Sequence, residues 1–235
     1  YLETFIWKND EVGRHFRQAL VEAAARGVKV YAMWDTFANL VVDPRFFRQL
    51  EGVQVRAQPL VTPSWIPTLR NLGRDHRKLL IVDSKVAYIG GYNIGSLYAD
   101  RWRDTHARIT GPAVGELENV FVDMWNQRPK GALISRRNQP DYLLPASAIG
   151  IRLSLYTALP RMAVYPIRNM YLEAIDRASE RIWMTQGYLI PDDDVVAALH
   201  QAASRGVDVR IVIPAESNHV IADWLSRGYY DRLLH

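Results

Sequence analysis

A histidine, a lysine and an asparagine stand close together in DHRKLLIVDSKVAYIGGYN, which spans residues 75–93. His76 and Lys78 are two residues apart, and side chains at this spacing share one face of an extended strand. The glycine pair at 90–91 lets the backbone turn or approach other groups closely, which returns Asn93 to the same edge. An imidazole, an ammonium and a carboxamide that converge form a receptor for a tetrahedral anion. Because a neutral imidazole can also attack phosphorus, this spacing predicts phosphoryl chemistry.

Two carboxylates near this stretch are expected to have different roles. Asp83 lies seven residues after His76, an odd number, so on a regular strand it faces the opposite side. At about 3.3 Å for each extended residue it also lies roughly 16 Å from Lys78. We therefore expect Asp83 to be a structural ion-pair or turn residue. Asp104, in RWRDTHARI, is the better partner for an active imidazole, because a carboxylate on Nδ1 fixes the tautomer and leaves Nε2 free.

An internal repeat organises the chain around this stretch. Residues 16–30 (FRQALVEAAARGVKV) align without gaps on residues 195–209 (VVAALHQAASRGVDV), at a constant offset of 179. Each copy has the pattern of a helix that ends at a glycine and leads into a β-branched strand, and each follows another strand, LETFIW or RIWMT. Carboxylates stand where the helix N-caps belong: Asp10 and Glu11 in one copy, Asp192, Asp193 and Asp194 in the other. The sequence therefore predicts a duplicated strand–helix–strand unit.

The remaining pattern also alternates between strands and helices. Strands are expected at 53–57, 79–83, 86–90 and 105–110. A helix near 113–126 would place four apolar side chains on one face: Val114, Leu117, Phe121 and Trp125. A helix at about 167–179 would do the same with Ile167, Met170, Tyr171, Ala174, Ile175 and Ala178. This alternation predicts an α/β sandwich of layers, with a domain junction near residue 130 between segments 1–130 and 131–235.

Composition limits the classes of protein that remain. With 49% apolar and 23% charged residues among 235, the chain is typical of a globular protein with one large or two smaller domains. The net charge of +4 fits a phosphate-bearing substrate or an anionic surface, and the absence of cysteine excludes disulfides and thiol chemistry. No apolar run approaches the roughly 18 residues that span a bilayer, and no signal peptide is visible. Because Tyr1 already lies in an expected strand, we expect a segment of a longer protein.

The central stretch resembles the signature of the phospholipase D superfamily: H-x-K, four residues, D, six residues, G-G or G-S, x, N. All its fixed positions are met, by His76, Lys78, Asp83, Gly90, Gly91 and Asn93. The flanking segment GGYNIGSLYADRWRDTHARITGP and the later YLEAIDRASERIWMTQGYLIPDDDVVAALHQAASRGVDVRIVIP are similar to the bacterial cardiolipin synthase branch. The resemblance covers nearly the whole chain.

This resemblance implies a duplicated phospholipase D-like α/β sandwich, a mixed sheet flanked by helices, whose second half is incomplete. It implies His76 as the nucleophile that forms a phosphohistidine, with Lys78 and Asn93 binding phosphate and Asp104 orienting the imidazole. Asp83, Gly90 and Gly91 would be structural positions of the motif. The resemblance implies neither a metal nor another cofactor.

One departure from the family pattern is plain in the sequence. The family carries a second such motif, whose histidine protonates the leaving alcohol, but these 235 residues contain no second H-x-K. Adding the repeat offset of 179 to position 76 gives 255, which lies beyond the last residue. We therefore expect the chain to stop before its second motif and to be impaired as an enzyme on its own.

By the same resemblance, the expected function is that of a phosphatidyltransferase or phospholipase D, most like cardiolipin synthase. It would act on phospholipids at the cytoplasmic face of a bacterial membrane and pass the phosphatidyl group to an alcohol or to water. A nuclease is the rival enzyme, although scattered arginines disfavour the basic groove that nucleic acid requires. A non-catalytic phosphate-binding half is the third possibility, and the oligomeric state stays open.

Two aromatic residues are candidate substrate contacts. Trp65 lies in QPLVTPSWIPTLRNLG, just before the motif, where it could form a lipid-facing lip or a packed connector. Tyr188, in QGYLIPD, resembles an aromatic residue that lines the family's pocket from the second half.

Overall fold

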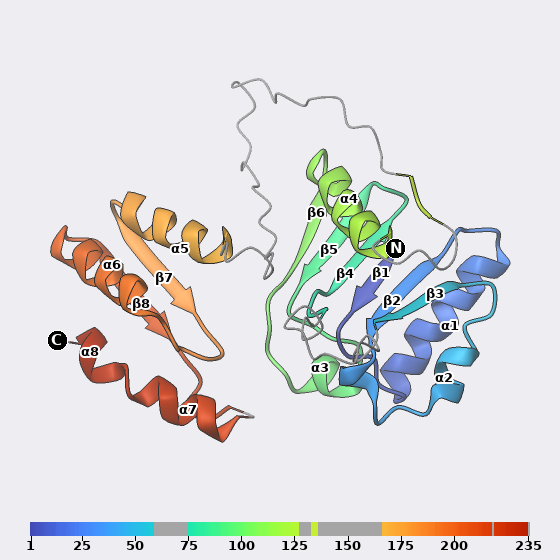
Figure 1. Cartoon of the computed structure of the whole chain (residues 1–235), viewed down its shortest axis with the longest axis horizontal. Coiled ribbons are helices and arrows are strands. Elements are labelled where there is room, and N and C mark those ends of the chain that lie inside the picture. Colours follow the sequence, from blue (N-terminus) through green and yellow to red (C-terminus); the bar gives the residue numbers. More distant parts are fainter. Residues whose placement is uncertain (59–74, 127–132, 136–165, 218, 235) are drawn as a thin grey trace, which may run out of the picture. The chain divides into compact units, whose positions relative to one another are not determined.

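The chain forms two compact units, Tyr1–Leu155 and Tyr156–His235, shown as a ribbon in Figure 1. The computed structural model describes residues 1–58, 75–126, 133–135, 166–217 and 219–234. The junction expected near residue 130 lies outside these described residues.

One six-stranded mixed sheet forms the centre of the first unit (Figure 1). Its strands are β1 (Leu2–Thr4), β2 (Tyr31–Asp35), β3 (Gln54–Gln58), β4 (Leu79–Val82), β5 (Val86–Gly90) and β6 (His106–Thr110). They follow the order β3-β2-β1-β4-β5-β6. Strands β1, β2 and β3 are parallel, whereas β4 pairs antiparallel with β1, and β5 and β6 continue in antiparallel pairs. The strands predicted at 53–57, 79–83, 86–90 and 105–110 are confirmed to within one residue at each end, whereas the strand expected over LETFIW is shorter and ends at Thr4.

Helices pack on both faces of this sheet. Helix α1 (Glu11–Ala25) and helix α2 (Pro44–Arg48) belong to one buried cluster, whose centre includes Trp7 and Trp34. Helix α4 (Ala113–Asn126) packs on the other face, and its predicted inward face is confirmed. The side chains of that face are at most 2% exposed: Val114, Leu117, Phe121 and Trp125. Two short helices lie in connections, η1 (Phe37–Asn39) after β2 and α3 (Ser96–Asp100) after β5. The predicted α/β class is therefore confirmed.

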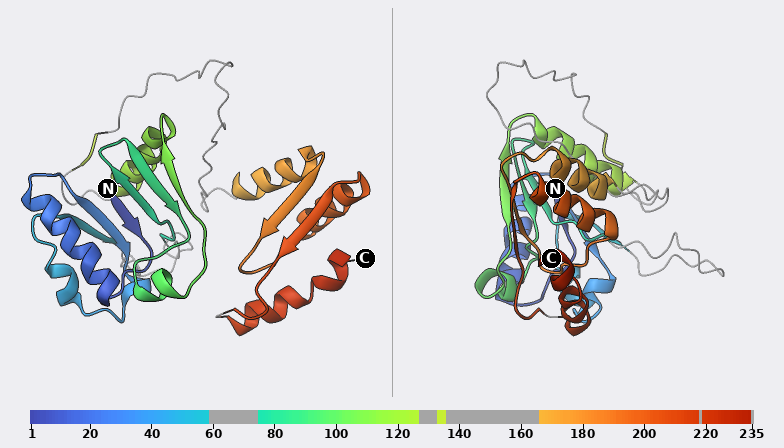
Figure 2. Two further views of the ribbon diagram at one scale, coloured as in Figure 1. Left: turned by 180° about the vertical axis from the view of Figure 1, so that it is seen from behind. Right: turned by 90° about the vertical axis from the view of Figure 1, so that its left-hand side faces the viewer.

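The second unit contains a parallel pair of strands with helices beside it, seen from behind in Figure 2. Its elements are α5 (Pro166–Arg177), β7 (Arg181–Thr185), α6 (Asp193–Ser204), β8 (Asp208–Val212), α7 (Val220–Arg227) and α8 (Tyr230–Leu234). Its core contains Ile175, Leu199, Ala202 and Val207. Across the described parts of both units, no helix has the length and apolar character needed to cross a membrane.

The predicted strand–helix–strand repeat is confirmed by β1–α1–β2 and β7–α6–β8, each with two parallel strands. Asp10 caps α1 by accepting a hydrogen bond from the Gly13 N–H at 2.9 Å, and Asp192 caps α6 in the same way. Both helices end before a glycine with positive φ, 87° at Gly27 and 89° at Gly206. Other residues strain in that left-handed region, which explains why both copies keep the glycine.

The helix predicted at 167–179 forms as α5, but its apolar face is only partly buried. Ile175 is 3% exposed, whereas Ile167 is 42% and Tyr171 is 38% exposed. The physical reason is that the two strands described in this unit cover only part of a helix face. Helical spacing therefore predicted the helix correctly, and the structure buries only part of its apolar face.

Candidate active site

The motif residues meet beside the chain that leaves the carboxyl end of β1. The Ile6 N–H donates to the Asn93 Oδ1 at 3.0 Å, and the Ile94 N–H donates to the Ile6 carbonyl oxygen, also at 3.0 Å. One residue earlier, the Phe5 ring centroid lies 4.6 Å from that of His76. Residues 87 apart in sequence, Ile6 and Asn93, are thus joined directly. The chain after β1 brings the H-x-K segment and the asparagine loop together.

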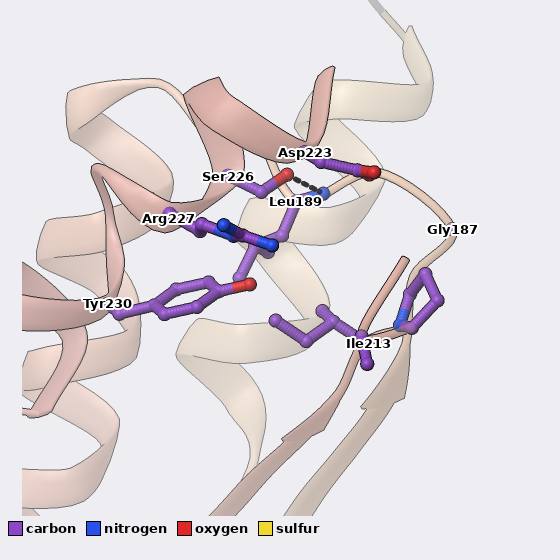
Figure 3. A pocket seen from close by; sticks show the side chains of 9 residues that line it. Gly187, Leu189, Ile213, Asp223, Ser226, Arg227 and Tyr230 are labelled. Carbon is purple, nitrogen blue, oxygen red and sulfur yellow. Dashed lines mark hydrogen bonds between the residues drawn. The ribbon is translucent and has the colours of Figure 1, made fainter. Parts of the chain in front are cut away.

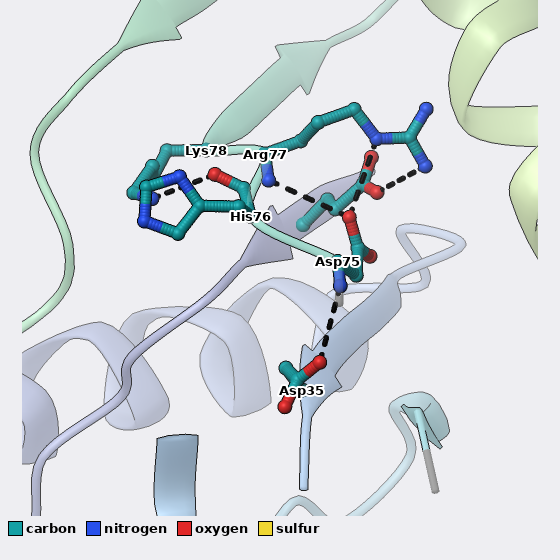
Figure 4. Close-up of polar contacts among 6 residues, drawn as sticks. Asp35, Asp75, His76, Arg77 and Lys78 are labelled. Atoms are coloured by element: carbon teal, nitrogen blue, oxygen red, sulfur yellow. Dashed lines mark hydrogen bonds and ion pairs between the residues drawn. The ribbon is translucent and has the colours of Figure 1, made fainter. Parts of the chain in front are cut away.

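Residues 75–78 are extended and direct their side chains alternately to two sides (Figure 4). On one side, Arg77 pairs with Glu3 (Nη2 to Oε1, 2.6 Å) and with Asp75 (Nε to Oδ1, 3.3 Å). On the other side lie His76 and Lys78, and the Lys78 Nζ donates to the His76 carbonyl oxygen at 2.6 Å. The two motif side chains therefore share a side, as the two-residue spacing predicts.

A group of buried carboxylates anchors this segment from the core. Glu3 and Asp35 are 0% exposed and Asp75 is 2% exposed. The Asp75 N–H donates to the Asp35 Oδ2 at 3.1 Å (Figure 4). Burial and the neighbouring Asp75 carboxylate raise the pKa of Glu3 well above its ordinary value, against the opposing effect of Arg77. The hydrogen bond to Asp35 holds the backbone of Asp75, the residue that precedes His76.

Lys78 is buried, at 5% exposure, although it is a lysine. Burial lowers the pKa of its ammonium to about 8, while the charges of Asp104 and Asp75 oppose this shift. Its Nζ lies 5.1 Å from the centroid of the Phe5 ring. At neutral pH the lysine is still protonated, so it can bind an anion with little water to displace.

His76 is more exposed, but its ring packs on Phe5. Partial burial and the nearby Lys78 charge lower the pKa of the imidazole, and Asp75 and Asp35 oppose them. The neutral form therefore predominates at pH 7, and a neutral imidazole is the form that can act as a nucleophile.

Asn93 is oriented by the hydrogen bond from Ile6 to its Oδ1. Its Nδ2 has no hydrogen-bond acceptor among the residues that the structure describes. Its two N–H groups are therefore available to an anion.

The glycine pair allows a close approach of the chain that enters β6. A Cβ on Gly91 would lie 2.0 Å from the Asp104 Oδ1, and one on Gly90 would lie 2.2 Å from the Thr105 carbonyl oxygen. Neither glycine has a positive φ. Close packing, and not a left-handed turn, is therefore what requires glycine at both positions.

Asp104 and Asp83 lie in different surroundings. The Asp104 Oδ1 accepts a hydrogen bond from the Thr105 N–H at 2.7 Å. The charge of the Asp104 carboxylate partly offsets the lowering of the Lys78 pKa by burial. No hydrogen bond joins Asp104 to His76 in this part of the structure. Asp83 lies in the turn between β4 and β5 with a φ of 52°.

The two aromatic candidates differ from the motif residues in their placement. Trp65 lies outside the described residues. Tyr188 belongs to the second unit, where it is 42% exposed and its ring centroid lies 5.5 Å from that of His219. Beside it, a small polar pocket lies where β7 and β8 end (Figure 3). There the Leu189 N–H donates to the Ser226 Oγ at 3.1 Å.

Sequence reasoning missed the residues that support the motif. Asn39, 5% exposed, donates from its Nδ2 to the carbonyl oxygens of Phe5 (2.8 Å) and Asp35 (2.7 Å). Its Oδ1 accepts from the Trp7 N–H at 2.7 Å. A single buried asparagine in the short helix η1 leaves no periodic signal, whereas Glu3 is a charged residue inside the expected strand LETFIW and could have been noticed in the sequence.

Replacing Gly91 with alanine should destabilise the first unit by about 1–3 kcal/mol, because the new methyl group overlaps the Asp104 carboxylate. Gly187 is the matched control, since a Cβ there meets nothing within 4 Å. Gly187→Ala should change stability by less than about 0.5 kcal/mol. Hydrogen exchange in each unit measures both effects separately. Equal, small effects of the two substitutions would contradict the close approach.

Sulfate should bind where His76, Lys78 and Asn93 converge, and should bind more weakly above about pH 8. Sulfate stays a dianion in this range, so the loss reports Lys78, whose ammonium is charged below its pKa and neutral above it. Above that pH the apparent Kd should rise by nearly tenfold for each further pH unit. The rise ends when the binding energy contributed by the ammonium charge is lost, and each 1.4 kcal/mol of that energy corresponds to about tenfold in Kd. Thermal shifts against sulfate concentration measure this.

The control for this titration is Lys85→Ala, which removes an exposed lysine near the β4–β5 turn and should leave the profile unchanged. Lys78→Ala should weaken binding at pH 7 and abolish the alkaline loss. A Lys78→Ala protein with the original affinity and pH profile would place the anion elsewhere.

An imidazole, a buried ammonium and an oriented carboxamide on a mixed α/β sheet define a phospholipase D-like domain. The chain belongs to the family described as "Cardiolipin synthase, PLD-like domain", whose model matches residues 1–125 and 171–235. The resemblance seen in the sequence is thereby confirmed.

Relatives agree with this assignment. Cardiolipin synthase A of Pseudomonas fluorescens (strain SBW25) is 33% identical over 226 residues, which are 92% of this chain and 46% of that protein. The major cardiolipin synthase ClsA of Bacillus subtilis (strain 168) is 32% identical over 243 residues, covering 100% of this chain and 50% of that protein. The chain therefore spans about half the length of the curated relatives it matches.

A solved structure shows the same fold. The phosphatidylserine synthase of Haemophilus influenzae Rd KW20 matches with a TM-score of 0.61 over 99% of this chain and 62% of that one. The identity is 15%, so the likeness concerns the fold alone.

Proposed function

We propose that this chain carries the nucleophilic half of a phosphatidyltransferase or phospholipase D, most like cardiolipin synthase. The observation that carries the proposal is the convergence of His76, Lys78 and Asn93 beside the end of β1, in a chain of the cardiolipin synthase family. Each group has the state that the chemistry needs: a neutral imidazole, a charged ammonium and a carboxamide with available N–H groups.

In the proposed reaction, the His76 Nε2 attacks the phosphorus of a phosphodiester. A P–N bond forms while the P–O bond to the leaving alcohol breaks, and the bonding electrons go to that oxygen, which then takes up a proton. An acceptor alcohol or water next attacks the phosphohistidine, loses its proton and releases His76. Lys78 and Asn93 stabilise the negative charge on the nonbridging oxygens in both steps. The scheme invokes no metal or other cofactor.

Other residues of the motif are proposed to support these groups. Asp104, beside Gly91 at the entry to β6, would orient the imidazole through Nδ1. Asp83, Gly90 and Gly91 would act structurally, through the β4–β5 turn and the close approach of β6. Tyr188 and Trp65 would contact substrate.

The proposed substrate is a phospholipid and the acceptor an alcohol or water. The net charge of +4 supports peripheral binding to an anionic membrane surface, which we place at the cytoplasmic face of a bacterial membrane. Nucleic acid is not the proposed substrate.

The test uses a phosphatidyl ester of p-nitrophenol, whose leaving group needs no proton, in vesicles with phosphatidylglycerol. We expect p-nitrophenol release, a phosphatidyl adduct on the peptide that contains His76, and transfer of the phosphatidyl group to the added lipid alcohol. Plasmid DNA serves as the competing substrate. Cleavage of DNA without any lipid transfer would overturn the proposal in favour of a nuclease.

A further inference from the structure

One aromatic ring contacts both the imidazole and the ammonium of the proposed site. The Phe5 ring centroid lies 4.6 Å from the His76 ring, with the planes tilted by 58°. The Lys78 Nζ lies 5.1 Å from the same centroid. Phe5 follows β1 and is separated from both residues by more than 70 positions in the sequence.

The backbone that carries this ring is held on both sides. Asn39 donates to the Phe5 carbonyl oxygen at 2.8 Å, and the next residue, Ile6, donates to the Asn93 Oδ1 at 3.0 Å. Because Asn39 is 5% exposed and bound through both its amide nitrogen and its oxygen, it cannot shift without breaking buried hydrogen bonds. The backbone that carries the Phe5 ring is therefore held in place.

An aromatic ring in this position has two physical effects. Its negative face attracts an ammonium, and this attraction is stronger when the ammonium is withdrawn from water, as Lys78 is. Its edge and face also give the imidazole a packing surface that restricts rotation of the His76 side chain. An aliphatic side chain of similar size offers the packing without the attraction.

We propose that Phe5 is a positioning residue, which holds the His76 imidazole and the Lys78 ammonium where both can contact the same tetrahedral anion. This role rests on the proposed function of the site, but its physical consequences can be measured without turnover. Lys78 is faced by His76, Asp75 and Asp104, and His76 by Lys78, Asp75 and Asp35. None of these groups is altered by a substitution at Phe5.

The test compares Phe5→Leu with the parent chain, using all 235 residues. The Lys78 ε-methylene is titrated by NMR, and sulfate affinity is measured at pH 7. Removal of the ring face should lower the pKa of Lys78 by roughly 0.4 to 1.5 units. Sulfate affinity at pH 7 should fall by about 1.1-fold at the small end of this range and about fourfold at the large end, since less of the lysine is then charged.

Matched variants separate this role from simple packing. Phe5→Tyr keeps the aromatic face and should restore both values, whereas Phe16→Leu changes a phenylalanine on the surface of α1 and should alter neither. Phe5→Met provides the same comparison as Phe5→Leu if the leucine variant does not fold. A rise in the pKa of Lys78 in the leucine or methionine variant would overturn the proposal, because the ring would then act only by excluding water.

Unchanged titration and sulfate affinity in both aliphatic variants would also overturn it. Failure of the proposed function gives a different pattern: the parent chain forms no adduct on His76, while the effect of Phe5 on Lys78 is still observed.

Discussion

Replacing His76 with alanine should reduce turnover of the p-nitrophenyl phosphatidyl ester by at least about 10⁴-fold, the scale seen when a nucleophile is removed from a covalent mechanism. The phosphohistidine cannot form without the imidazole, and the remaining Lys78 and Asn93 stabilise charge but do not attack phosphorus. Initial rates of p-nitrophenol release measure the loss, and mass spectrometry should find no phosphatidyl adduct.

The matched control is His15→Ala, which removes an exposed histidine from α1 and should change the rate less than twofold. Because His76 itself is exposed, added imidazole should enter the space left in His76→Gly and restore part of the turnover. A His76→Ala protein within tenfold of the parent rate would refute the nucleophilic role and leave anion binding as the function of the site.

The second large effect concerns the leaving group. These 235 residues contain a single H-x-K, so no second motif histidine is present to protonate a leaving alkoxide. General acid catalysis contributes about 10²–10⁴-fold. The chain should therefore cleave the p-nitrophenyl ester at least about 10²-fold faster, relative to phosphatidylglycerol, than an enzyme that holds such an acid.

The measurement is the ratio of kcat/KM for the two lipids in identical vesicles. The comparison protein is a cardiolipin synthase from one of the relatives, assayed in the same way. Equal ratios for the two proteins would show that another group of this chain donates the proton, and the expectation would then be wrong. A Brønsted plot over substituted phenols provides a check, since a missing acid gives a steep dependence on the pKa of the phenol.

Local patterns in the sequence determined the elements and the residues of the proposed chemistry. The period of the apolar residues predicted α4 and its buried face, and the gapless repeat predicted β1–α1–β2 and β7–α6–β8. The fixed spacing of His76, Lys78 and Asn93 pointed to phosphoryl transfer. Such signals are readable because they depend on neighbours within a few turns or strand residues.

The supports of the site were decided only by the tertiary structure. Phe5, Asn39 and Asp75 acquire their roles from contacts with residues 32 to 71 positions away, which no local period records. Burial is also a property of the assembled fold: it lowers the pKa of Lys78 to about 8 and raises that of Glu3.

The glycine pair illustrates the same division. The sequence indicated that positions 90–91 turn the chain or let it approach another group, and it left the choice open. The structure decides for close approach, because the Asp104 carboxylate occupies the space that a Gly91 side chain would need. Residue type sets what a position permits, and only the packing of distant segments determines which permitted role is used.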